Sequence, residues 1–169
     1  MRRAATILVA VLTAGLWSGC SDPSPAKPTD RLWISELPTG PSKTITAFLV
    51  TRARGDNYFG AFWQGSMYRG GHDLFEWESA GPGRAKLRFL QDDGLREVRF
   101  ESCEPSTGFD HCIVLHGDPK GVGRYQSRKR WIVRGRKGAT ALHSTIRDLA
   151  TEDDDLARLA GSLLPEDVE

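Results

Sequence analysis

Residues 83–103, GRAKLRFLQDDGLREVRFESC, contain the pattern that decides the fold class. Within residues 85–89, apolar Ala, Leu and Phe alternate with Lys and Arg, and residues 95–103 alternate in the same way. This alternation is typical of a strand that has one face in a core and the other in water. Because Asp93-Gly94 between the two runs is a strong hairpin signal, we expect an antiparallel β-hairpin here.

Short apolar runs of the same kind continue on both sides of the hairpin, separated by Gly, Pro, Asp and Asn. They lie at residues 32–34, 44–51, 58–68, 73–78, 109–115 and 124–133. Such a series of about eight strands with tight turns forms an antiparallel meander, which must close into a barrel or fold into a sandwich to protect its edges. We expect residues 31–137 to form this mainly β domain, as a closed barrel in preference to a β-sandwich.

After Gly138 the periodicity of the apolar residues changes from that of strands to that of helices. Residues 144–150 and 152–164 carry apolar side chains at helical spacing, and Thr151 stands at a plausible N-cap position. We therefore expect residues 138–169 to form a C-terminal helical segment with an acidic tail. A meander of strands followed by a helix resembles the layout of lipocalin-like (calycin) barrels. That resemblance implies a closed barrel, whereas a fold alone does not imply a function.

The beginning of the chain has the pattern of an export signal. Arg2 and Arg3 precede an apolar run at residues 4–16, and the small residues Ser18 and Gly19 follow it. The apolar run has about 13 residues, fewer than the roughly 20 that a membrane-spanning helix needs. A secretory signal peptide is therefore expected, with a secreted protein cut elsewhere or an uncleaved anchor as alternatives.

Small residues that lead directly into Cys20 resemble the lipobox of bacterial lipoproteins. The resemblance implies that residues 1–19 are removed, that Cys20 carries a diacylglycerol, and that the protein is anchored in a membrane of the cell envelope through this lipid. Residues 20–30 are rich in Pro and polar side chains, which predicts a disordered tether. Ser21 is no obvious inner-membrane retention signal, so we expect the outer membrane in preference to the inner one.

Two further cysteines, Cys103 and Cys112, follow in the β domain. An exported chain enters a compartment in which disulfides form, and the predicted register places both residues on the outer face of neighbouring strands. We expect a disulfide between them, with two free thiols or a pair of metal ligands as alternatives.

No arrangement of residues predicts catalysis, a metal site or a cofactor. His72, His111 and His116 each lie near an acidic residue, but their spacings are not those of known ligand pairs. Ser66 lacks the glycines two residues on either side that a nucleophile elbow requires. We expect a protein that is not an enzyme, with a periplasmic hydrolase that uses His72 or His116 as the alternative.

Aromatic residues are numerous, and they either fill the barrel or line a cavity in it. Barrels of about eight strands are often filled by their own side chains. If a cavity is present, a small apolar ligand is expected to contact one set of residues: Phe62, Trp63, Tyr68, Phe75 and Trp77.

The formal net charge is only +1, but residues 120–137 are strongly basic and residues 148–169 strongly acidic. An exported protein rarely meets nucleic acid, so we do not expect it as a partner. Arg124, Arg128 and Arg130 face anionic membrane head groups, are neutralised by the acidic C-terminal segment, or form a solvated strand face. The function expected from the sequence is binding of a small apolar ligand or of an envelope protein. A purely structural envelope component is a further alternative.

Overall fold

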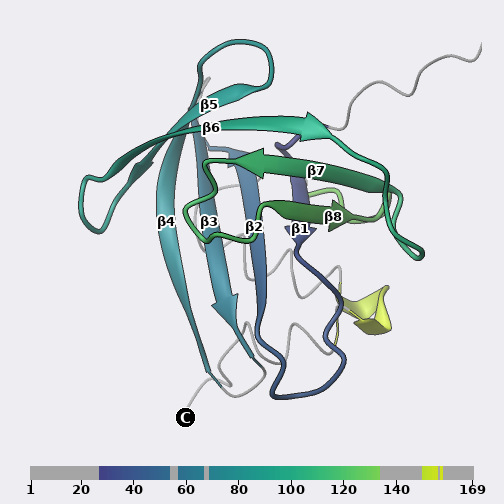
Figure 1. Ribbon diagram of the computed structural model, residues 1–169. Helices are drawn as coiled ribbons and strands as arrows, with labels where there is room; N and C mark the ends of the chain where they lie inside the picture. The colour runs from purple at the N-terminus through teal and green to yellow at the C-terminus, as the bar shows by residue number, and fades with distance from the viewer. Residues whose placement is uncertain (1–26, 54–56, 67–68, 134–149, 156, 158–169) are drawn as a thin grey trace, which may run out of the picture.

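The chain folds into a closed barrel of eight antiparallel strands, as seen in a computed structural model that describes residues 27–53, 57–66, 69–133, 150–155 and 157 (Figure 1). The strands are β1 (Arg31–Ile34), β2 (Ile45–Arg52), β3 (Tyr58–Gly65), β4 (Gly70–Ser79), β5 (Arg84–Phe89), β6 (Leu95–Ser102), β7 (His111–His116) and β8 (Arg124–Ser127). Each strand pairs with the next along the chain, and Ile34 of β1 pairs with Gln126 of β8 to close the barrel. The predicted meander and its closure are confirmed, and the architecture is consistent with a calycin-like fold.

The hairpin of β5 and β6 forms where alternation and the Asp93-Gly94 signal predict it. The backbone N–H of Phe89 donates to the carbonyl oxygen of Gly94 (2.9 Å), and the Asp92 side chain accepts from Gly94 N (2.9 Å). Asp93 has a φ of 55°, a left-handed conformation that Asp tolerates better than most residues. Local turn chemistry therefore agrees with the register of the two strands.

The inside of the barrel holds a core of alternate residues from every strand. Fully buried members of this core include Trp33, Phe75 and Tyr125, and Phe62 is 1% exposed. The ring of Phe62 packs against that of Phe75 with 5.1 Å between centroids. In Figure 1 the strands β6, β7 and β8 run across the view in front of the more upright β2, β3 and β4, so two crossing walls enclose this core.

A second apolar cluster covers the outer face of β1 and β2. Its buried members are Leu32, Ile34, Ile45, Ala47 and Trp131, with Leu37, Trp63, Phe109 and Ala150 packed against them. Strands β1 and β2 are thus buried on both faces, which explains why their sequences are almost continuously apolar.

The last strand is shorter than the run at residues 124–133 suggests. Strand β8 ends at Ser127, whose hydroxyl donates to the buried carbonyl oxygen of Leu32 (2.7 Å), and a turn follows in which Trp131 N donates to Arg128 O (3.0 Å). The turn breaks the alternation, so Trp131 joins the outer cluster and not, as the alternation suggested, the face of Tyr125.

The predicted C-terminal helix lies mostly outside the described residues, as do the signal peptide and most of the tether. In the described part of the C-terminal segment, Ala157 N donates to Asp153 O (2.8 Å), the spacing of a helical bond. Among the residues that the structure describes, no helix has the length and apolar character needed to cross a membrane.

Candidate functional site: a cavity at one end of the barrel

One end of the barrel is closed by the loop between β7 and β8. Asp118 in this loop accepts from the backbone N–H groups of Lys120 (2.9 Å), Val122 (2.8 Å) and Gly123 (2.8 Å), and from the hydroxyl of Tyr125 (2.9 Å). Burial, together with the charge of Asp118, raises the pKa of Tyr125, so its hydroxyl keeps the proton that it donates. This carboxylate therefore holds both the loop and a core side chain in place.

The other end of the barrel contains a cavity of about 990 Å³. It lies where β3 and β5 begin and where β4 and β6 end, which is one end of an antiparallel barrel. Its inner wall contains Tyr58, Trp77, Phe100 and Ile113. We call it the mouth cavity. Trp77 is 9% exposed, and its ring packs on that of Phe100 at 5.8 Å. The volume is at the upper end of the range for small-molecule sites.

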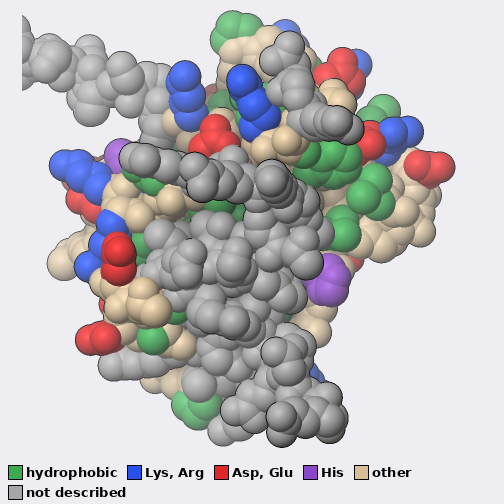
Figure 2. Space-filling view, turned by 180° about the vertical axis from the view of Figure 1, so that it is seen from behind, with side chains coloured by type: hydrophobic (Ala, Val, Ile, Leu, Met, Phe, Trp, Pro, Cys, Tyr) green, Lys and Arg blue, Asp and Glu red, His purple; other side chains and the backbone are tan. Residues whose placement is uncertain are grey.

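The open side of the mouth cavity combines exposed apolar and charged side chains. Phe59 (38% exposed) lies at the same end on the outer face of β3, because its neighbour Tyr58 points inward, whereas Leu95 (60% exposed) stands at the beginning of β6, away from this end. Glu76 accepts from Arg88 Nε (2.9 Å), and this hydrogen bond raises the pKa of Arg88. Among the described side chains visible in Figure 2, several basic and acidic groups lie beside one another. The mouth cavity is therefore amphipathic.

The lining of the mouth cavity includes only one described residue of the predicted ligand-binding set, Trp77. Phe62 and Phe75 also point into the barrel, but they are packed deep in its filled part. Trp63 faces the opposite side of β3 and packs against the outer cluster, because successive side chains of a strand point to opposite faces. Contact of Trp63 with a ligand stays a prediction, and Tyr68 lies outside the described residues.

Sequence reasoning missed Tyr58, Phe100 and Ile113 as lining residues. All three belong to alternating runs and were assigned to strands, so their inward direction was available from the pattern. Their depth along the barrel axis was not available, because it depends on how far each strand is shifted against the next.

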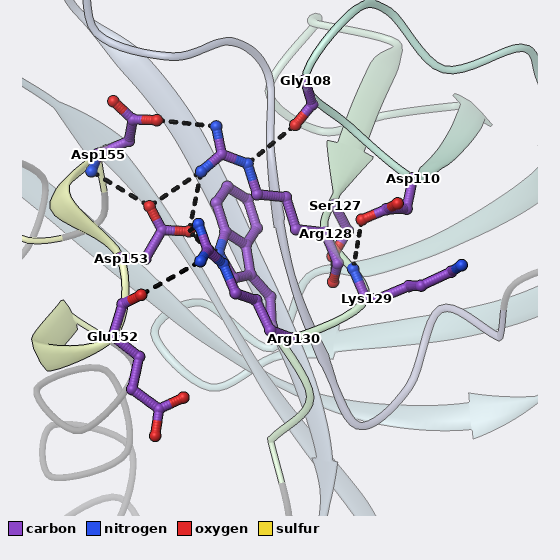
Figure 3. A network of polar contacts seen from close by, with 10 residues as sticks. Gly108, Asp110, Ser127, Arg128, Lys129, Arg130, Glu152, Asp153 and Asp155 are labelled. Atoms are coloured by element: carbon purple, nitrogen blue, oxygen red, sulfur yellow. Dashed lines mark hydrogen bonds and ion pairs between the residues drawn. The ribbon is translucent and has the colours of Figure 1, made fainter.

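The three arginines proposed to face anionic head groups have partners inside the protein. Arg124 donates to the carbonyl oxygen of Glu104 (2.6 Å), and its Nε lies 3.3 Å from Cys112 Sγ. Arg128 and Arg130 both bind Asp153 of the C-terminal segment (Figure 3). Of the interpretations that the sequence left open, neutralisation by the acidic segment describes Arg128 and Arg130. Contact of these arginines with lipid stays a prediction.

Asp153 is the centre of this network, with its side chain 1% exposed. It accepts from Arg128 Nη1 through both oxygens (2.9 Å each), from Arg130 Nη2 (2.8 Å) and from Trp131 Nε1 (2.7 Å). Burial alone would raise the pKa of Asp153, but the hydrogen bonds from Trp131 and Arg128 and the two guanidinium charges lower it. Its net pKa lies below the ordinary value. Asp155 adds a second ion pair to Arg128 (2.8 Å).

The histidines are not brought together in the described part of the chain. His116 Nε2 lies 3.3 Å from Glu101 Oε2 on the exposed face, and His72 pairs across the strands with Trp63. Burial and the charge of Arg31 lower the pKa of His111. No cluster of three or more potential metal ligands occurs among the described residues. Whether the protein catalyses a reaction stays untested.

Cys103 and Cys112 form a disulfide between the end of β6 and the beginning of β7. Cys103 N donates to Cys112 O (3.1 Å), so the bridge continues the strand pairing by one residue. The disulfide closes the β6–β7 connection close to Ser102, a residue that lines the mouth cavity.

No protein-family model matches the sequence, and neither a curated protein sequence nor a solved structure matches the chain.

Proposed function

We propose that this protein is a lipid-anchored component of the bacterial cell envelope that binds a small, mainly apolar ligand in the mouth cavity and catalyses no reaction. The observation that carries the proposal is the contrast between the two ends of the barrel. The core around Phe62 and Phe75 is filled, whereas the end beside Trp77 has an aromatic wall and room for a ligand. Small-molecule sites usually combine apolar and aromatic walls with polar groups that orient the ligand.

Ligand binding is tested with the chain from residue 21 onward, which retains every described residue. A neutral fluorescent probe, N-phenyl-1-naphthylamine, gains emission when it enters an apolar site. We expect a saturable gain with this protein. Replacing Ser102, an exposed lining residue, with Trp fills the mouth cavity without removing a core side chain and should abolish the gain.

The matched control for this substitution is Ser42→Trp, because Ser42 is exposed in the loop between β1 and β2 at the opposite end of the barrel. We expect Ser42→Trp to bind the probe like the unmodified chain. Equal binding by Ser42→Trp and Ser102→Trp would contradict the proposed site, and absence of binding by all three proteins would contradict ligand binding.

The lipid anchor has a separate test in a bacterial host that expresses the whole precursor. Labelled palmitate should be incorporated into the protein, and Cys20→Ala should abolish incorporation and release the protein from membranes. The double variant Cys103→Ser/Cys112→Ser should still be labelled, because those cysteines form a disulfide. A Cys20→Ala protein that stays with the membranes would refute the anchor.

A further inference from the structure

The segment that leads to the expected lipid anchor enters the fold at the mouth cavity. Lys27, Pro28 and Thr29 belong to the cavity lining, and Lys27 follows Cys20 by seven residues. Trp33 Nε1 donates to Pro28 O (3.0 Å) and Asp30 N donates to Val50 O (2.6 Å), which fixes this entry point on the barrel. A lipid on Cys20 would therefore hold the membrane on the same side as the mouth.

The length of the segment between Cys20 and Lys27 limits the distance between the mouth cavity and the bilayer surface. Seven residues span at most about 25 Å when fully extended. The mouth thus stays within about 25 Å of the bilayer surface, which is less than the thickness of a typical hydrocarbon core. The tether therefore keeps a ligand in the mouth cavity close to the bilayer surface.

The charges around the mouth favour an anion. Four basic residues and two acidic ones are part of the lining: Lys27, Arg84, Lys86, Arg88, Glu76 and Glu78. Arg88 is paired with Glu76, and Lys86 stands opposite Glu78 and Glu97 in the strand register. Lys27 and Arg84 remain, both exposed and without an ion pair to any described residue.

Arg84 has a further property that points to an anionic ligand. It stands directly opposite Arg99 on β6, and like charges in directly opposed positions are destabilising. Arg99 is paired with Glu101 (3.2 Å), whereas Arg84 lies at the open end of the barrel beside the turn at Gly81 and Gly83. A bound anion beside Arg84 would relieve this repulsion.

From these observations we infer that the mouth cavity faces the membrane and takes an anionic phospholipid directly from the bilayer. Its phosphate contacts Lys27 and Arg84. Its acyl chain reaches the wall formed by Trp77 and Phe100. The inference rests on the proposed function, because it names the ligand class of the same cavity and the side from which the ligand enters.

The experiment uses the lipidated mature protein in phosphatidylcholine vesicles, so that every variant is attached to the bilayer in the same way. The vesicles contain either phosphatidylglycerol with a nitroxide on its acyl chain or an equal amount of nitroxide-labelled phosphatidylcholine. Quenching of tryptophan fluorescence reports entry of the labelled chain into the mouth cavity. We expect stronger quenching by the anionic lipid and loss of most of this quenching in Trp77→Phe.

The basic residues are tested with Lys27→Gln and Arg84→Gln. Each should lower the preference for phosphatidylglycerol about fivefold, the contribution of one basic side chain at an anionic surface. Arg96→Gln is the matched control, because Arg96 is an exposed arginine at the opposite end of the barrel, and it should leave the preference unchanged. A preference that Arg96→Gln lowers as much as Arg84→Gln would overturn the assignment of the anion to Arg84.

The other outcomes separate this inference from the proposed function. Equal quenching by both labelled lipids would overturn the anionic ligand. Absence of quenching by either lipid would overturn the membrane-facing mouth. In both cases saturable binding of the neutral probe by the chain from residue 21 onward would leave the proposed function intact, and absence of that binding would remove the proposed function as well.

Discussion

Replacement of Asp153 with Asn removes one charge from the network that attaches the C-terminal segment to the barrel. Asn has nearly the same shape, but it has one acceptor oxygen where Asp has two. The NH2 group of Asn would face the guanidinium groups of Arg128 and Arg130, and because both sides are hydrogen-bond donors, no hydrogen bond could form between them. Trp131 Nε1 (2.7 Å from the carboxylate) would compete with Arg128 for the remaining oxygen.

The structure sets the size of the expected effect. Removing one partner of a buried ion pair costs about 3–5 kcal/mol. Here Arg130 is half exposed and regains water, and Arg128 keeps Asp155 (2.8 Å) and the carbonyl oxygen of Gly108 (2.9 Å). We therefore expect the lower end, about 3 kcal/mol. For a chain of this size the melting temperature should fall by about 6–12 °C.

The assay is thermal unfolding followed by circular dichroism and by tryptophan fluorescence. The control is Asp154→Asn, which removes the same charge from the neighbouring, exposed position. If the C-terminal segment detaches before the barrel unfolds, the fluorescence change of Trp131 should precede the loss of β signal in Asp153→Asn. Equal melting temperatures of the Asp153→Asn and Asp154→Asn proteins would refute the assigned role of the buried carboxylate.

The same network predicts a dependence on pH. Because the pKa of Asp153 is lower in the folded protein than in the unfolded chain, its contribution is present above the ordinary pKa of 3.8. The contribution is lost as the pH falls through the folded-state pKa. The difference in melting temperature between the unmodified protein and Asp153→Asn should therefore be constant from neutral pH down to about pH 4 and shrink below it.

Three further substitutions test the barrel itself. Gly60→Ala should destabilise the fold by about 1–3 kcal/mol in urea unfolding, since a Cβ would press on Phe75 and lie 2.8 Å from Leu49 O, whereas Gly71→Ala, with open space around it, should not. Tyr125→Phe should lower the free energy of unfolding in urea by about 1.5 kcal/mol through loss of the bond to Asp118, and an unchanged free energy of unfolding would show that the bond is not stabilising. Cys103→Ser/Cys112→Ser should cost about 2.5–3 kcal/mol under oxidising conditions only, and a variant that differs from the reduced unmodified protein would contradict this origin.

The strand order could be predicted from the sequence because its signals are local. Alternation fixed the direction of side chains in β5 and β6, and turn residues separated neighbouring strands. The disulfide followed from the same register, because Cys103 and Cys112 fall one step beyond the last strand pair, Ser102 with Ile113. Closure between β1 and β8 joins residues far apart in the sequence, and it was expected only because a meander must protect its edges.

The positions of the tryptophans show where local signals end. β1 and β2 are apolar on both faces, so their sequences do not say which face is inside and which is covered from outside. Trp131 covers the outer face only because a turn after Ser127 redirects the chain. The direction of Trp63, in contrast, could be read from the sequence. Trp63 directly follows Phe62 in one strand, and successive side chains of a strand point to opposite faces. Grouping aromatic residues by their distance in sequence does not use this alternation.

The interactions of the described residues give a second argument for the mouth cavity as the ligand site. On the outer face of β1 and β2, apolar side chains are already covered by Trp131, and Arg128 and Arg130 are already bound by Asp153. At the closed end, Asp118 is occupied by the backbone of its own loop and by Tyr125. At the mouth, in contrast, Phe59 is exposed, and Arg84 stands opposite another arginine. A surface whose apolar side chains are covered and whose charges are paired gains little free energy from binding a ligand. A ligand is therefore expected where exposed apolar side chains and an unpaired positive charge lie together.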